Sequence, residues 1–137
     1  MNIEGAKILV TGGCGLIGST TIDQLLAENP AKIVIYDNLV RGSMHNVAEL
    51  LNDKRVELVK GDIRDVDATR RVTEGMDAVI HMATLRITAC AAEPREALEV
   101  MCDGTYNVLE AAHLAGVKRF VTASSASIYG LADTFPT

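Results

Sequence analysis

The fold of this chain is decided by the stretch ILVTGGCGLIG at residues 8–18. A short apolar run ends there in a cluster of glycines, and an amphipathic segment follows at once. This pattern predicts a strand, a tight turn and the start of a helix. Glycines in such a turn allow a positive φ and let backbone N–H groups approach a pyrophosphate without an intervening Cβ. The first N–H groups and the positive dipole end of the helix then face the same anion.

The glycine spacing Gly13-x-Gly15-x-x-Gly18, followed by an acidic residue after the next apolar run, points to a dinucleotide site. The acidic residue is Asp37, which is placed to accept hydrogen bonds from both hydroxyls of an adenosine ribose and to repel a 2′-phosphate. Asp37 therefore favours NAD over NADP, although Arg41 nearby would suit that phosphate. The alternative interpretation is an ordinary glycine-rich turn without a ligand.

The composition is that of a folded protein and excludes several classes of partner. The 137 residues suffice for one domain with a core, and 48% of them are apolar against 23% charged. The net charge is −5, and no run of like charge predicts binding to nucleic acid or to a membrane surface. No apolar run reaches the roughly 18 residues of a membrane span, and the N-terminus lacks the regions of a signal peptide. The three cysteines have no metal-binding spacing, which predicts free thiols in the cytoplasm.

Strand and helix signals alternate along the chain, which predicts an α/β fold with a parallel sheet and right-handed crossovers. The expected strands are residues 6–10, 33–36, 56–59, 77–81 and 119–123, and the expected helices are residues 15–28, 44–51, 66–73 and 94–115. The last helix carries two adjacent apolar stripes, so we expect it to pack on the sheet and on a second surface. Met101 belongs to the first stripe and is expected in the core.

Ligands of such sheets bind outside the carboxyl ends of the strands. Five strands end there in the glycine loop, Asp37, Asp62, the segment 81–84 and a group of serines after residue 123. Asp62 would suit the edge of an adenine, but it also fits a simple turn. The serines are able to hydrogen-bond a reacting oxygen, although serine is also a common turn residue. We interpret His81 as structural and Cys14 as a packing residue.

These motifs closely resemble the N-terminal part of the extended short-chain dehydrogenase/reductases, in the NAD-dependent epimerase/dehydratase group that includes the UDP-glucose 4-epimerases. The matching segments follow the family's order and are Thr11-Gly12-x-x-Gly15-x-x-Gly18, Asp37-Asn38-Leu39, Gly61-Asp62-Ile63-Arg64-Asp65, His81-Met82-Ala83, Gly104-Thr105-Tyr106-Asn107 with the five residues after it, and Ser124-Ser125-Ala126-Ser127-Ile128-Tyr129-Gly130. The resemblance implies that residues 1–137 form an incomplete Rossmann-type doubly wound parallel sheet of about five strands. We therefore expect an NAD-binding domain that is the N-terminal portion of a longer enzyme, with the substrate domain absent.

The resemblance also implies roles for individual residues. The expected NAD contacts are Gly12, Gly15, Leu16, Ile17, Gly18, Asp37, Asn38, Asp62, Ile63, Ala83 and Thr84. Arg86 and Ser127 would contact the substrate, and Ser125 would be catalytic by hydrogen-bonding the reacting sugar oxygen. The implied reaction is epimerisation of a nucleotide sugar, most naturally a UDP-sugar, by transient hydride transfer from C4 to NAD. The full-length enzyme would be a cytoplasmic homodimer that pairs through the helix 94–115.

Three departures from the family pattern bear on this hypothesis. Family dehydratases usually carry Thr-Asp-Glu where this chain has Ser125-Ala126-Ser127, which favours an epimerase. Met101 and Thr84 stand where the family commonly has Asn and Ala, and Met101 removes a polar contact near the cofactor. The family's Tyr-x-x-x-Lys is missing from residues 1–137, so we expect this stretch alone to be inactive. A decarboxylase, a dehydratase, a sugar reductase and a non-catalytic NAD-binding module stay open as alternatives.

Overall fold

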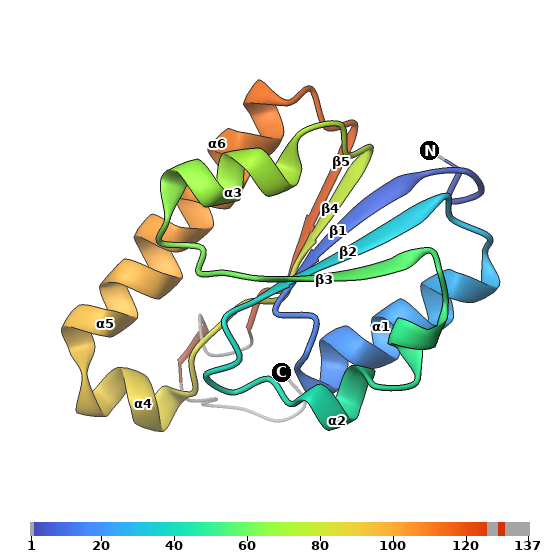
Figure 1. The fold of residues 1–137 in the computed structure, drawn as a ribbon. Helices are drawn as coiled ribbons and strands as arrows, with labels where there is room; N and C mark the ends of the chain where they lie inside the picture. The colour runs from blue at the N-terminus through green and yellow to red at the C-terminus, as the bar shows by residue number, and fades with distance from the viewer. Residues whose placement is uncertain (1, 126–128, 131–137) are drawn as a thin grey trace.

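A computed structural model of the chain describes residues 2–125 and 129–130. Its centre is a five-stranded, all-parallel sheet with the strand order β3-β2-β1-β4-β5, as Figure 1 shows. The strands are β1 (Lys7–Thr11), β2 (Lys32–Asp37), β3 (Val56–Lys60), β4 (Ala78–His81) and β5 (Arg119–Thr122). The predicted α/β fold is confirmed. Because the chain crosses from β3 to the far side of β1, the switch point of the sheet lies between β1 and β4.

Helices cover both faces of this sheet. They are α1 (Leu16–Ala27), α2 (Met44–Val47), α3 (Val66–Thr73), α4 (Ile87–Ala92), α5 (Pro94–Leu98) and α6 (Thr105–Leu114), with a 3₁₀ turn η1 (Leu50–Asn52) and a π-helical segment η2 (Glu99–Gly104). In Figure 1, α1 and α2 lie on one face, while α3 and α6 lie together on the other. None of the helices in the described residues is long and apolar enough to cross a membrane.

The central strands contribute to two cores because successive side chains point to opposite faces. Ile8 and Val10 pack with Ile22 of α1 on one face, and all three are buried. Leu9 packs on the other face with Val108 of α6. Burial on both faces explains why the strands that lie in the middle of the sheet have nearly continuous apolar sequences.

The helical region after β4 differs from the expectation. The helix α4 was not expected, and the helix expected at 94–115 runs through three sections, with π-helical η2 between α5 and α6. The prediction that Met101 lies in the core is wrong, since the residue is 41% exposed. A π turn contains an extra residue, so the 3.6-residue periodicity that grouped Met101 with Val108 does not hold across η2.

Candidate nucleotide-binding site

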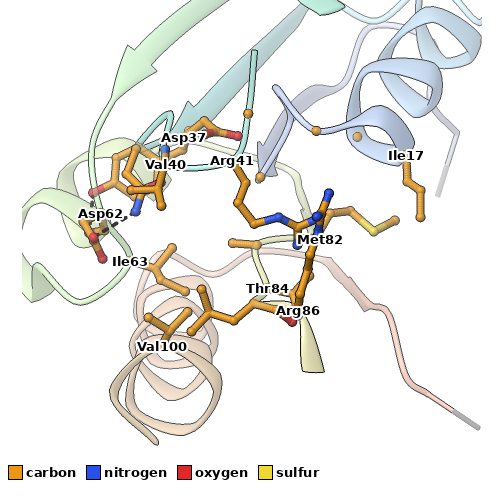
Figure 2. A pocket seen from close by; sticks show the side chains of 18 of the residues that line it. Ile17, Asp37, Val40, Arg41, Asp62, Ile63, Met82, Thr84, Arg86 and Val100 are labelled. Carbon is orange, nitrogen blue, oxygen red and sulfur yellow. Dashed lines mark hydrogen bonds between the residues drawn. The ribbon is translucent and has the colours of Figure 1, made fainter. Parts of the chain in front are cut away.

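A cavity of about 560 Å³ lies at the carboxyl ends of the strands. Figure 2 shows Asp62, Ile63 and Val100 toward one end of it, and Ile17 and Met82 toward the other. The structure brings together all eleven residues expected to contact NAD, and Arg86, in the wall of this cavity. The wall also contains Arg41 and several residues that sequence reasoning did not single out as contacts, namely Tyr36, Val40, Gly42, Asn46, Gly61, Arg64, Met82, Leu85, Glu96, Val100 and Ala123.

The glycine loop forms one wall and makes two close backbone approaches. Gly12 has φ +69°, and a Cβ there would lie 2.6 Å from the backbone nitrogen of Ala83. A Cβ on Gly18 would lie 2.5 Å from the carbonyl oxygen of Gly12, so α1 begins directly against the loop. The first N–H groups of α1 have no partner within the helix. Because Leu16 and Ile17 line the cavity, this helix end offers N–H groups and a positive dipole to an anion there.

Asp37 presents a fixed carboxylate at the end of β2. It is 7% exposed, its Oδ2 accepts the Cys14 N–H at 3.0 Å, and its Oδ1 accepts the Leu39 N–H at 2.8 Å. A carboxylate has about four acceptor positions, and these bonds occupy two of them. The remaining capacity matches the two hydroxyls of a ribose, which is the arrangement that an NAD site requires.

The Cys14 side chain is buried within the glycine loop. Burial raises the pKa of its thiol to about 11, and the neighbouring charge of Asp37 adds to the increase. The Cys14 carbonyl accepts hydrogen bonds from the Asn46 side chain at 2.8 Å and from the Ser43 N–H at 3.0 Å, which join the loop to the start of α2. A protonated, enclosed thiol fits the packing role expected from the sequence.

Asp62 forms the polar end of the cavity, and its two oxygens already accept several hydrogen bonds. Arg64 donates to it from Nε at 3.0 Å, from Nη2 at 2.8 Å and from the backbone at 2.9 Å, and Asn38 donates from Nδ2 at 3.0 Å. The Arg64 guanidinium is the main reason why the pKa of Asp62 is lowered to about 2. A ligand amine that bonds this carboxylate must therefore displace or share one of the existing donors.

His81 is buried at the end of β4, where its ring contacts side chains of β1 and α6. Its Nδ1 lies 2.7 Å from Thr11 Oγ1 and its Nε2 lies 3.1 Å from Thr105 Oγ1. Thr11 Oγ1 also accepts the Ala83 N–H at 3.4 Å. Burial lowers the pKa of His81, which keeps the ring neutral. These contacts agree with a structural role for His81 and reveal Thr105 as a partner that no local pattern indicated.

The serines after β5 are placed differently from the other site residues. Ser125 is exposed, and among the described residues the cavity wall on this side reaches only Ala123. Ser127, the second residue expected near the substrate, lies outside the described residues. The catalytic role of Ser125 and the substrate role of Ser127 stay predictions. In the part of the chain that the structure describes, no group of three His, Cys, Asp or Glu residues could hold a metal ion.

Comparison with known proteins decides the family. Residues 8–137 match the family model described as the NAD dependent epimerase/dehydratase family. The chain belongs to this family. The resemblance inferred from the motifs is thereby confirmed, and the prediction of NAD is confirmed at the level of the epimerase/dehydratase family.

Curated members of the epimerase/dehydratase family include similar proteins of very different length. The UDP-glucose 4-epimerase of Mycolicibacterium smegmatis is 38% identical over 134 residues, which are 96% of this chain and 42% of that protein. A protein described as UDP-glucose 4-epimerase from Klebsiella pneumoniae is 39% identical over 132 residues, which are 90% of this chain and 92% of that relative. The chain thus spans about two fifths of the M. smegmatis protein.

Solved structures of epimerases and dehydratases share the fold of this chain. The UDP-glucose 4-epimerase from Stenotrophomonas maltophila, with bound NAD and formylated UDP-arabinopyranose, is 30% identical with a TM-score of 0.86. The match covers 96% of this chain and 40% of that one. The dTDP-glucose 4,6-dehydratase from Streptomyces venezuelae, also solved with NAD, is 36% identical with a TM-score of 0.88. The match covers 93% of this chain and 42% of the dehydratase chain.

Proposed function

We propose that residues 1–137 form the NAD-binding domain of a nucleotide-sugar 4-epimerase and are the N-terminal portion of a longer enzyme. The observation that carries this proposal is the cavity at the strand ends. It combines a glycine loop, an open helix N-terminus and the Asp37 carboxylate with two acceptor positions left for a ribose. Membership of an NAD-dependent family supports the same cofactor.

Each part of the cavity has a separate task in this proposal. The N–H groups at the start of α1 bind the pyrophosphate, Asp37 binds the adenosine ribose, and Asp62 with Ile63 borders the adenine. Ala83 and Thr84 border the rest of the cofactor. NAD, when bound, supplies reversible hydride acceptance at the sugar carbon.

We assign the substrate to Arg86, in the cavity wall, and to the serines after β5. Arg86 and Ser127 contact the nucleotide sugar, and the Ser125 hydroxyl hydrogen-bonds the reacting oxygen. The 137 residues contain no Tyr-x-x-x-Lys to take the hydroxyl proton, so we expect NAD binding without turnover from this stretch alone.

A UDP-sugar is the preferred substrate class because the similar curated proteins are described as UDP-glucose 4-epimerases. The likeness to a dTDP-glucose 4,6-dehydratase keeps dehydration as the second candidate activity. Decarboxylation, sugar reduction and a purely NAD-binding role are further alternatives. Turnover assays of the full-length protein with UDP-glucose, UDP-galactose and UDP-glucuronate separate epimerase from decarboxylase, and turnover of dTDP-glucose would favour the dehydratase.

Pairing of two copies in the cytoplasm completes the proposal. The second apolar stripe of the helix 94–115 includes Leu98 and Leu109, which are 47% and 48% exposed. Leu98 belongs to α5 and Leu109 to α6, on either side of the π-helical η2, and exposed leucines of this kind suit packing against a second copy. A homodimer of the full-length enzyme would cover them.

The cofactor assignment is tested by titrating NAD and NADP into the protein and into its Asp37→Asn variant. The amide has one acceptor oxygen in place of two, so we expect NAD to bind at least about tenfold more weakly. We expect the wild type to prefer NAD and the variant to lose most of that preference, because the charge that repels a 2′-phosphate is gone. Asp23→Asn, on the exposed side of α1, is the matched control and should bind like the wild type. Tighter binding of NADP than of NAD to the wild type would overturn the assignment.

A further inference from the structure

The side chain of Met101 contacts the wall of the cavity through its sulfur atom. The Met101 Sδ lies 3.4 Å from the Leu85 backbone nitrogen and 3.3 Å from the Thr84 hydroxyl oxygen. Both Thr84 and Leu85 line the cavity. Met101 therefore contacts the cavity wall at two neighbouring residues.

The segment 82–86 is held by hydrogen bonds at its start, at its end and between them. Its start is held by β1, since the Met82 N–H donates to the Thr11 carbonyl at 3.0 Å. Its end is held by α4, where the Arg86 carbonyl accepts a backbone N–H from the next helical turn at 2.9 Å. Between these points the Leu85 N–H donates to the Met101 sulfur. Met101 thus ties the middle of this cavity wall to η2.

The segment η2 is itself held firmly enough to serve as this anchor. Val100 is 8% exposed and lines the cavity, so the residue before Met101 is fixed by packing. Gly104 packs so closely on Ile63 that a Cβ there would lie 2.6 Å from the Ile63 Cδ1. The side chain of Met101 therefore leaves a backbone that is held on both sides. A thioether has no hydrogen to donate and accepts only weakly, but its flexible chain allows it to reach the Leu85 N–H and the Thr84 hydroxyl, whose one hydrogen is shared with the Leu85 carbonyl oxygen at 3.3 Å.

We propose that Met101 is a positioning residue for the cofactor, which holds the Thr84–Leu85 wall of the cavity through hydrogen bonds to its sulfur. Thr84 is its partner in this role. The proposal rests on the proposed function, because it assumes that the cavity binds NAD. It assigns to Met101 no contact with the reacting atoms.

The test compares two replacements of Met101 by calorimetric titration with NAD. Met101→Leu keeps the size of the side chain but removes the acceptor. Met101→Asn restores an acceptor, because the Asn oxygen is the same number of bonds from Cα as the Met sulfur. We expect the Leu variant to bind NAD about three- to tenfold more weakly, and the Asn variant to bind within about twofold of the wild type. Met44→Leu replaces another exposed methionine that lies outside the cavity wall, and it should change nothing.

Two further measurements separate positioning from a loss of stability. The thermal melting temperature of the Leu variant should stay within about 2 °C of the wild type, since Met101 is not in the core. The loss of NAD affinity in the double variant Met101→Leu/Thr84→Val should be smaller than the sum of the losses in the two single variants, because each single change already removes the contact between Met101 and Thr84. Additive losses, or equal weakening by the Leu and Asn variants, would overturn the proposal.

The outcomes also distinguish this inference from the proposed function. Wild-type protein that binds no NAD in the titration overturns the proposed function and the role of Met101 with it. Wild-type protein that binds NAD while Met101→Leu binds equally well overturns the role of Met101 alone.

Discussion

Replacing Gly12 by alanine tests the close packing of the glycine loop on the turn after β4. The new Cβ would lie 2.6 Å from the Ala83 nitrogen and 2.7 Å from the Met82 carbonyl carbon. Such atoms do not approach within 3.0 Å, so the turn would have to retreat by at least about 0.4 Å. Both contacts are to backbone, so no side-chain rotation relieves them.

Two costs add in this variant. An alanine at the Gly12 φ of +69° costs about 1–2 kcal/mol, and forcing a methyl group into a packed site costs about 1–3 kcal/mol. We therefore expect the free energy of unfolding to fall by about 2–5 kcal/mol, a large part of the stability of a typical domain. NAD binding should weaken as well, because Met82 and Ala83 line the cavity.

The matched control for this experiment is Gly75→Ala. Gly75 has φ +70°, but nothing lies within 4 Å of the Cβ that it would gain. It should lose only the backbone cost of about 1–2 kcal/mol, and its NAD affinity should not change. Urea denaturation measures the stabilities, and titration measures the affinities. If Gly12→Ala is no more destabilising than Gly75→Ala, the loop and the turn are not in the close contact described above.

Three further results follow from the structure. Burial lowers the pKa of His81 in the folded protein, so His81 of the unfolded chain binds a proton at a higher pH than His81 of the folded chain. The protein should therefore keep its full free energy of unfolding above about pH 6.5 and lose part of it as the pH falls below that value. His81→Asn should flatten this part of a plot of melting temperature against pH. Ser125→Ala in the full-length enzyme should lower kcat by about 10²-fold or more with an unchanged Kd for NAD, and a fully active variant would remove Ser125 from the mechanism. Leu98→Asp together with Leu109→Asp should shift the full-length protein from dimer to monomer in light scattering, whereas a dimer that persists would place the interface elsewhere.

The strands and the glycine loop were predictable because they rest on local patterns. Continuous apolar runs marked the central strands, and the spacing from Gly12 to Gly18 marked the turn into α1. The helix α4 has no such pattern, since its six residues ITACAA show no amphipathic period and no side chain caps its start. The π-helical segment η2 includes Gly104, which packs closely on Ile63, 41 residues earlier in the chain, so no local window of sequence contains this contact.

In the candidate site, too, the positions of the residues were predictable from the sequence but their hydrogen-bond partners were not. The positions Asp37 and Asp62 followed from the rule that ligands bind at strand ends, and both lie in the cavity wall. Sequence spacing gave no sign that Arg64 and Asn38 already bond the Asp62 carboxylate. It also gave no sign that Met101 would bond to the wall, because Leu85 and Met101 are 16 residues apart and belong to different segments of the chain.

The enclosure of Cys14 gives the glycine loop a chemical reporter of its own motion. An alkylating reagent reacts with thiolate, so a buried thiol with a pKa of about 11 is modified only when the loop opens. Cys90 and Cys102 are more accessible and would be modified first. The third and slowest phase of alkylation is that of Cys14, and its rate measures how often the loop opens. The degree to which NAD slows that phase would show how strongly the ligand holds the loop closed, without any label added to the protein.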